Sequence, residues 1–464
     1  MLVLVAAALA YDPDSLRAEA TFGLFRDEYD YLQEPATLGH QDGRHVYTLL
    51  GNQGGATRLS LGYLGAVGPG VLGGIADGSV IGGEESTTST TAPTPAAGET
   101  VTVESSVSRV HQGAAFVGYG LPVSERLSLG AGFAIEARRW DASLTPVPGG
   151  SPSVGGTLTN VSEDGDSIRK ETGTYEALDT SWQATVGVAV AIADAELEVD
   201  ARLQRSVGTM RAEATYITDT VVYTLEGRPP DASLDEGLAA WLPGVAADLT
   251  APLGANAAVR VFAEGAAGPA TLTGPDTEET LSDYTDPAAP VDVFTTTRLS
   301  PTQMLLYEGE ALVALHVGAG ATEVRAGVAV AVEGHDLGAS SSSQTEERLR
   351  EVDERYVGLS TPVAVEVAAS PRWRLRVGGR FVHARLHYDG SDRVTSEAGE
   401  GEIVAVRQQS DYEQSYVEFA VGTRFEVSPA FALDASAGGT GAPDGDRVSI
   451  NLGNLLVSGV LRFP

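Results

Sequence analysis

Apolar and polar residues alternate with a period of two along much of the chain. In the segment 195–207, Leu197, Val199, Ala201 and Leu203 are separated from one another by charged or polar side chains. Alternation over about ten residues indicates a β-strand with one apolar face. The same alternation recurs at 126–138, 182–192, 323–333 and 416–426. The pattern predicts an all-β protein.

The connections between these segments alternate between short and long. Tight turns lie within stretches such as 191–199 and 425–433, whereas the intervening connections are long and rich in Ser, Thr, Asp, Glu and Pro. Strands of about ten residues with tight turns at one end and long loops at the other are typical of a transmembrane antiparallel up-and-down β-barrel. The long, extracellular loops are expected near 82–107, 141–180, 209–236, 267–302, 335–354 and 389–411, and the short turns are expected in the periplasm.

The alternating pattern predicts about sixteen strands. An even number is what a bacterial single-chain barrel with both ends in the periplasm requires. The weakest patterns are at 15–26 and 44–51, so fourteen strands is the alternative. The expected strands are 15–26, 44–51, 56–66, 108–121, 126–139, 182–193, 195–208, 241–250, 256–266, 303–318, 321–334, 354–369, 373–389, 412–427, 431–438 and 448–462.

The end of the chain, "LLVSGVLRFP" at 455–464, is an amphipathic strand that closes with an aromatic residue. It resembles the C-terminal strand of Gram-negative outer-membrane β-barrel proteins, which serves as their assembly signal, although here Pro464 follows Phe463. The resemblance implies a bacterial outer-membrane location. It also implies contacts with outer-membrane lipid and lipopolysaccharide, and recognition of 455–464 by the barrel assembly machinery.

The first ten residues, "MLVLVAAALA", form an apolar run that ends in Ala-Leu-Ala. This pattern is typical of a secretory signal peptide, here without the usual basic start. We expect residues 1–10 to be a signal-peptide remnant and residues 11–464 to form a single barrel domain. The alternative for residues 1–10 is a short N-terminal strand.

The amino-acid composition argues against several classes of function. The formal net charge is −33, which argues against nucleic acid as a partner because a phosphate backbone requires a basic surface. The chain contains no cysteine, so disulfides and Cys-ligated metals are excluded. No Gly-x-Ser-x-Gly motif or phosphate-binding glycine loop occurs. We therefore expect no enzyme activity, no metal site and no cofactor.

The most basic strand is "PRWRLRVGGRFVHARLHY" at 371–388, which contains no acidic residue. Its arginines alternate with Trp373, Leu375 and Val377, and lipid-facing positions must be apolar. We expect the arginines to face the lumen and a β-bulge near 378–381 to turn the later basic residues inward as well. The predicted pore-lining basic residues are Arg372, Arg374, Arg376, Arg380, His383 and Arg385.

Acidic residues occupy the inward positions of other predicted strands. The predicted pore-lining acidic residues are Glu196, Glu198, Asp200, Glu308, Glu310, Glu366, Glu418 and Glu426. Diffusion porins are similar in placing basic and acidic walls across a constriction, and pore-lining charge sets ion preference. The alternative is that these residues form ion pairs with neighbouring strands and only stabilise the wall.

The leading functional hypothesis is a channel for passive diffusion of small hydrophilic solutes. A second is a channel for hydrophobic substrates, similar in size to the long-chain fatty-acid and aromatic-hydrocarbon transporters. Those proteins carry an N-terminal plug, and strand-like sequence beginning at residue 15 leaves little room for one here. A third hypothesis is a structural or surface-interaction barrel without an open pore.

Overall fold

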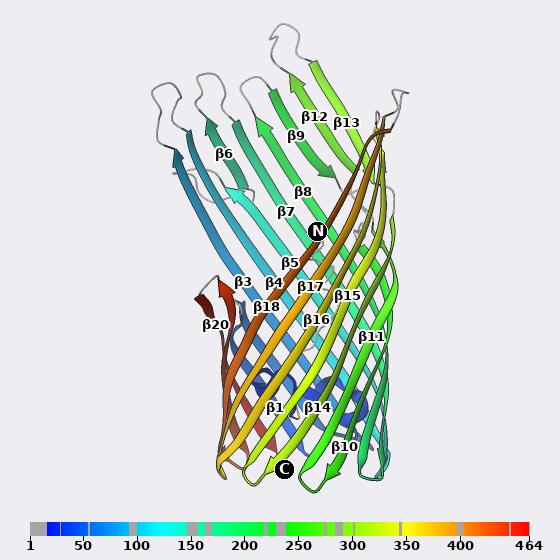
Figure 1. Ribbon diagram of the computed structural model, residues 1–464, viewed down its shortest axis with the longest axis vertical. Coiled ribbons are helices and arrows are strands. Elements are labelled where there is room, and N and C mark those ends of the chain that lie inside the picture. The colour runs from blue at the N-terminus through cyan, green and yellow to red at the C-terminus, as the bar shows by residue number, and fades with distance from the viewer. Residues whose placement is uncertain are drawn as a thin grey trace.

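The chain folds into one closed antiparallel β-barrel, seen from the side in Figure 1. The computed structural model describes residues 16–27, 29–53, 56–91, 100–145, 156–162, 169–217, 221–228, 238–272, 276–283, 291–299, 302–342, 346–396, 402–444 and 447–463. Residues 1–10, the expected signal-peptide remnant, lie outside them. None of the described helices is long and apolar enough to cross a membrane.

Each strand of the ring pairs with the next, and pairing of the first strand with the last, from Arg44↔Phe463 to Gln53↔Asn454, closes it. The sixteen strands of the ring are β1 (Arg44–Gln53), β2 (Ala56–Val67), β3 (Gly70–Thr91), β4 (Thr100–Ser124), β5 (Leu127–Thr145), β7 (Arg169–Ile192), β8 (Ala195–Ile217), β10 (Leu238–Gly254), β11 (Ala257–Leu272), β14 (Thr302–Ala319), β15 (Thr322–Ser342), β16 (Glu346–Ser370), β17 (Trp373–Ser396), β18 (Glu402–Ser428), β19 (Phe431–Asp444) and β20 (Arg447–Phe463).

The predicted number of sixteen strands is confirmed, but one predicted strand is wrong and one strand of the ring was not predicted. Residues 15–26 were expected to form a strand, whereas Phe22 and Gly23 have φ angles of 53° and 70°, which a strand does not allow. The missing strand is β3, whose run of glycines weakens the strand signal. The ring needs no strand before β1, because β1 and β20 already pair with each other.

The strands extend far into the ranges expected to be long loops. The predicted loop near 335–354, for example, is mostly the paired ends of β15 and β16. Four shorter strands widen this extracellular extension of the sheet. They are β6 (Gly156–Ser162), β9 (Val221–Arg228), β12 (Asp276–Asp283) and β13 (Val291–Leu299). Many polar residues in these ranges interrupt the alternating pattern from which the strands were predicted.

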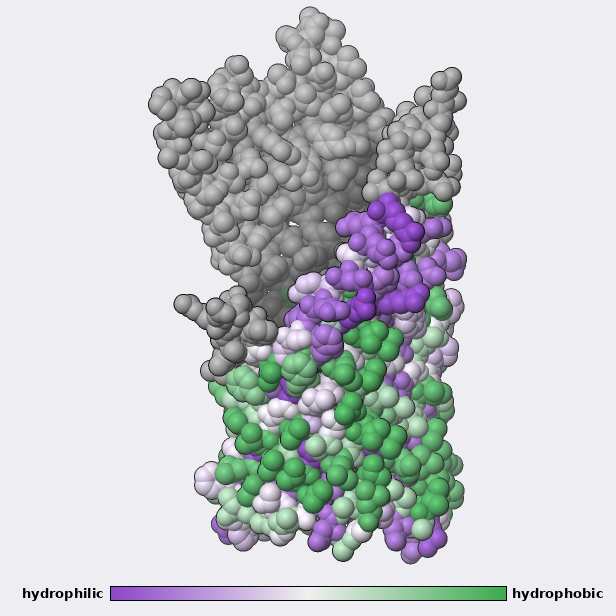
Figure 2. Space-filling view, in the orientation of Figure 1, coloured by the Kyte–Doolittle hydropathy of each residue, from purple (hydrophilic) through white to green (hydrophobic). Residues whose placement is uncertain are grey.

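The outer wall carries a broad apolar band. Figure 2 shows hydrophobic residues around the lower part of the barrel, with hydrophilic residues above them. On β14, Val313 is 54% exposed on the outer face, whereas its neighbours Leu312 and Ala314 are buried on the inner face. Side chains that alternate in this way place one apolar set in the bilayer.

Residues 16–43, hereafter the plug, precede β1 and fold inside the barrel. They contain α2 (Leu16–Glu19), the 3-10 helix η1 (Asp30–Gln33) and α3 (Pro35–Leu38). Figure 1 shows these helices within the lower part of the barrel, near the end that carries the tight turns. By the orientation rule for outer-membrane barrels, this is the periplasmic end.

Candidate functional site

The plug contacts the wall around almost the whole ring. Helix α3 packs against β3, β4, β5, β7 and β8, η1 packs against β2, β3 and β4, and α2 packs against β18, β19 and β20. On the remaining arc, Arg260 of β11 donates to the Gly23 carbonyl oxygen at 3.1 Å, and Arg325 of β15 donates to the Leu24 carbonyl oxygen at 2.6 Å. The plug therefore spans the lumen at its periplasmic end.

Apolar side chains hold the plug from several sides. Leu32 and Leu38 belong to a buried cluster with Tyr47, Leu64 and other wall residues. On the opposite arc, Leu24 and Phe25 pack with Leu312, Ala314, Ala329 and Ala364. Burial of one such large side chain stabilises a structure by about 1.5–3 kcal/mol. The plug is consequently a packed part of the native fold.

Glycines in the wall make room for the plug backbone. A Cβ atom on Gly130 would overlap the carbonyl group of Pro35, and one on Gly120 would overlap the backbone nitrogen of Gly39. A Cβ atom on Gly378 would lie 2.5 Å from the Ala20 carbonyl oxygen. Small residues on the inner faces of the strands therefore permit close approach of a second backbone.

A first polar contact joins the plug to β2 and β3. Arg58 donates to Glu19 and to Asp77, each at 3.0 Å, and Ser60 donates to Asp77 at 3.0 Å. Burial raises the pKa of Glu19 to about 7, and the neighbouring Arg58 guanidinium opposes that rise. Farther around the ring, Thr37 donates to Glu198 at 2.9 Å.

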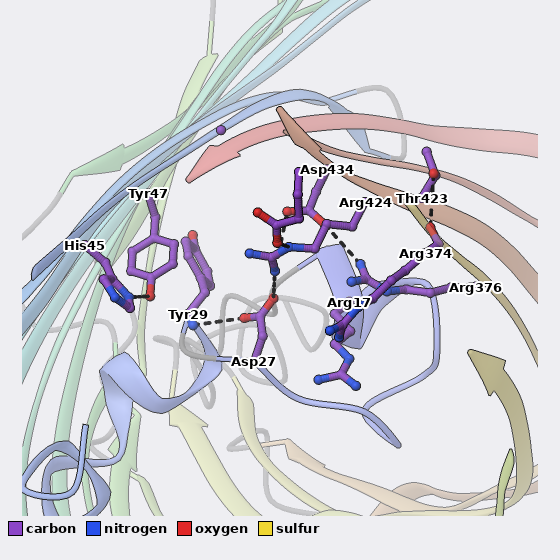
Figure 3. A network of polar contacts seen from close by, with 12 residues as sticks. Arg17, Asp27, Tyr29, His45, Tyr47, Arg374, Arg376, Thr423, Arg424 and Asp434 are labelled. Atoms are coloured by element: carbon purple, nitrogen blue, oxygen red, sulfur yellow. Dashed lines mark hydrogen bonds and ion pairs between the residues drawn. The ribbon is translucent and has the colours of Figure 1, made fainter. Parts of the chain in front are cut away.

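A second polar network joins the plug to β16–β19. Arg17 donates to both oxygens of Glu366, at 3.0 and 3.1 Å. Figure 3 shows Arg376, Arg424 and Asp434 of this network. Arg376 donates to Glu366 at 2.8 Å and to Asp434 at 3.2 Å. Arg424 continues the network, because it lies 3.8 Å from Asp434. This network fixes α2 against the wall.

The expected bulge in β17 is wrong. The strand pairs with β18 in one unbroken register from Trp373↔Phe425 to Val394↔Val404. Alternation therefore continues, and Val382 and Ala384 face inward while His383 and Arg385 face outward. Their nearest partners on the outer face are the polar residues Ser415 for His383 and Asp411 for Arg385. The register contains no bulge that would turn them inward.

Three of the six predicted basic residues face the lumen, namely Arg374, Arg376 and Arg380. The other three do not line a pore. Arg372 lies in the periplasmic turn before β17. His383 contacts Ser415, at 2.9 Å, and Arg385 pairs with Asp411, at 3.2 Å, on the outer face.

The eight predicted acidic residues occupy inward positions, but they do not face the arginines across an open lumen. Glu366 pairs with Arg376, and Arg380 donates to Glu418 at 2.6 Å, both between adjacent strands. These contacts agree with the alternative drawn from the sequence, in which the charged residues form ion pairs between neighbouring strands of the wall. The remaining inward positions are Glu196, Glu198, Asp200, Glu308, Glu310 and Glu426.

Several residues that build the site were not predicted from the sequence. The plug residues Arg17 and Arg26 contact the wall, and the wall residues Arg58, Arg260 and Arg424 contact the plug. Asp434 pairs with Arg376 within the wall. One sequence signal was available for the plug. Pro35 stands at the first positions of a short helix and Gly39 at its end, a spacing that favours a helix over a strand.

These features define the class of protein. A closed sixteen-stranded barrel with an apolar outer band and a polar, occupied lumen is a bacterial outer-membrane β-barrel. The N-terminal plug is its distinguishing element.

Known proteins resemble the chain only in their structures. No model of a protein family matches the sequence, and no curated protein is significantly similar. The Ralstonia pickettii toluene transporter TbuX is similar with 13% identity, a TM-score of 0.41, and coverage of 98% of this chain and 99% of that one. A Pseudomonas aeruginosa FadL homologue has 11% identity, a TM-score of 0.42, and coverage of 97% and 98%. The Pseudomonas putida toluene transporter TodX has 11% identity, a TM-score of 0.42, and coverage of 98% and 100%. Similarity this low carries no weight for the activity of this chain.

Proposed function

We propose that this protein is an outer-membrane uptake channel for small hydrophobic or amphipathic solutes, with the plug as its periplasmic gate. The observation that carries the proposal is the contact of the plug with the wall on every side of the ring. A channel for free diffusion of hydrophilic solutes needs a continuous water-filled path. The plug occupies that path, which favours the second of the hypotheses drawn from the sequence over the first.

The inner wall also carries an apolar surface away from the plug. Leu242 of β10 and Met304 and Leu306 of β14 face inward and form a buried cluster with Ala240 and Ala270. Apolar side chains on the inner face of a barrel give no benefit to a hydrophilic solute. They suit a solute with an apolar body, because ligand sites are mostly lined by such residues.

Two measurements on purified protein test the proposal. In planar bilayers, the intact chain is expected to give almost no conductance, and deletion of residues 16–43 is expected to open a large, steady pore. In proteoliposomes, the intact chain is expected to take up a small aromatic hydrocarbon faster than an arabinose-sized sugar. The Gly338→Ala variant is the control for effects of expression and purification. Its added Cβ meets open space, so it is expected to behave like the parent chain.

A large steady conductance of the intact chain would contradict the gate. Equal uptake of the sugar and the hydrocarbon would contradict the solute class. Loss of heat-modifiable migration in gels on deletion would show that the plug is needed for barrel folding. In that case, a disulfide tether between the plug and the wall replaces the deletion as the test of the gate.

A further inference from the structure

We propose that the space between the plug and strands β16–β20 is a binding site for a small oxyanion, either a phosphate or a carboxylate. The site is a cavity of about 350 Å³ at the periplasmic end of the lumen. That volume lies at the lower end of the range for small-molecule sites. A role for this site in transport rests on the proposed function, whereas anion binding itself does not.

The lining of the cavity is strongly basic in a very acidic protein. Six arginines line it, namely Arg17, Arg26, Arg374, Arg376, Arg424 and Arg462. Only two carboxylates, those of Asp27 and Glu426, share the lining. The chain has 30 basic residues and a net charge of −33, so chance does not explain this concentration.

Within the lining, Glu426 pairs with Arg424 and Arg462, each at 3.0 Å. The acids that pair with Arg376 stand behind the arginines and outside the lining. Glu366 and Asp434 pair with Arg376, and their side chains are only 6% and 3% exposed. Their charge keeps the guanidinium groups in place. An incoming anion would nevertheless meet the N–H donors of the arginines before it met these carboxylates. Planar guanidinium groups match carboxylate and phosphate oxygens in bidentate geometry.

Arg374 is the residue of the cavity most available to a ligand. Its side chain is 52% exposed, and its guanidinium lies 3.5 Å from Glu366. Among the described residues, this guanidinium has no hydrogen-bond partner. Arg374 also lies directly opposite Arg424 in the β17–β18 ladder, and like charges in that arrangement are destabilising. A bound anion between the two strands would relieve the repulsion.

The test measures anion binding to the full chain in a neutral detergent at low salt by titration calorimetry. The probes are inorganic phosphate, octyl phosphate and, as the uncharged amphipath, octyl glucoside. Phosphate or octyl phosphate is expected to bind, and Arg374→Gln is expected to weaken binding about tenfold, since charge-assisted hydrogen bonds are lost. Glu426→Gln removes a carboxylate from the lining and is expected to tighten binding. Arg385→Gln, which changes an arginine of the outer face, is the matched control.

The outcomes distinguish the sources of the anion. Binding of both phosphates with these responses supports a site for free anions and for charged headgroups. Binding of octyl phosphate alone supports a headgroup site that also needs an apolar tail. The proposal is overturned if neither binds, if octyl glucoside binds equally well, or if Arg374→Gln and Arg385→Gln behave alike. Anion binding without uptake of hydrocarbon in proteoliposomes would reject the proposed function and keep this site.

Discussion

At the scale of single residues, the inner wall beside the plug carries charges that are buried and yet paired. Arg376 is the clearest case, because its side chain is 1% exposed and lies between Glu366 and Asp434. Removing a charge from water is unfavourable, and only good geometry with opposite charges offsets the loss. Such a group stabilises the fold conditionally, since removal of Arg376 leaves Glu366 and Asp434 buried with fewer opposite charges, namely Arg17 and Arg374 for Glu366 and Arg424 for Asp434.

Replacement of this arginine is therefore expected to be severe. Arg376→Gln leaves two carboxylates buried and is predicted to lower stability by about 3–5 kcal/mol. The midpoint of thermal unfolding, followed by heat-modifiable gel migration, measures the loss. Arg385→Gln provides the matched control, because its ion pair is exposed and contributes little. Similar midpoints for the two variants would show that the network around Arg376 does not support the fold.

Glu19 predicts how plug docking depends on pH. Its pKa in the docked plug is raised to about 7 from the model-peptide value of 4.5, so docking favours the protonated form. The stabilising contribution is present below pH 4.5 and is lost as pH rises toward 7, by at most about 3 kcal/mol. Protease access to the plug is expected to increase across this window, and less so in Glu19→Gln. Identical pH profiles for the parent chain and Glu19→Gln would show that Glu19 does not cause the pH dependence of plug docking. Arg58 and Asp77 also face this group.

At the scale of elements, the fit between the plug and the strands depends on wall residues without side chains. Helix α3 lies so close to β4 and β5 that a Cβ atom on Gly120 or Gly130 would overlap its backbone. The strand ladder itself would accept alanine at these positions, because strands tolerate a Cβ. The glycines are thus required by the neighbour inside the lumen and not by the strand.

Substitution of one such glycine is expected to release the plug without breaking the barrel. Gly130→Ala is predicted to raise single-channel conductance and protease cleavage within 16–43, while heat-modifiable migration is retained. Gly338→Ala places its methyl group in open space on β15 and is expected to behave like the parent chain. Unchanged protease access in Gly130→Ala would show that α3 can shift to accommodate a methyl group.

At the scale of the whole molecule, solvent on the two sides of the wall decides which residues each strand can carry. On the face seen in Figure 2, the outer surface of the lower barrel is mostly hydrophobic, and the described residues above it are mostly hydrophilic. One strand can therefore carry two kinds of outward residue along its length. On β17, Trp373 and Leu375 are outward near the start of the strand, and His383 and Arg385 are outward farther along it.

This division predicts that an outward arginine is tolerated only above the band. Val313→Arg lies within the band and is expected to destabilise the barrel by about 2–4 kcal/mol. Leu349→Arg lies on the outer face of the extension and is expected to be neutral within about 0.5 kcal/mol. Urea titration of the protein in lipid vesicles compares the two. A similar loss for both variants would place the membrane boundary higher than the apolar band indicates.

Part of the candidate site could be predicted from the sequence. Alternation correctly placed Arg374, Arg376 and Arg380 inward, because lipid excludes charge from the outer face of that part of the strand. The expected bulge was wrong for His383 and Arg385, because unbroken alternation places both residues outward. The sequence does not show where the strand leaves the bilayer, and so it does not show that outward charges are allowed there. It also could not show that Glu366 and Asp434 share Arg376, since pairing partners depend on the register of strands distant in sequence.

The sequence by itself determined that this chain is an antiparallel barrel with one face in lipid. Its count of sixteen strands agrees with the structure because the false strand at 15–26 offsets the missed strand β3. Those properties follow from the period-two pattern, which is local and is imposed by the bilayer on each strand separately. Only the tertiary structure decided that residues 16–43 fill the lumen and that the inward arginines meet plug and wall acids there. A short segment such as the plug carries no periodic signal, and closure of the ring alone creates the interior that it occupies.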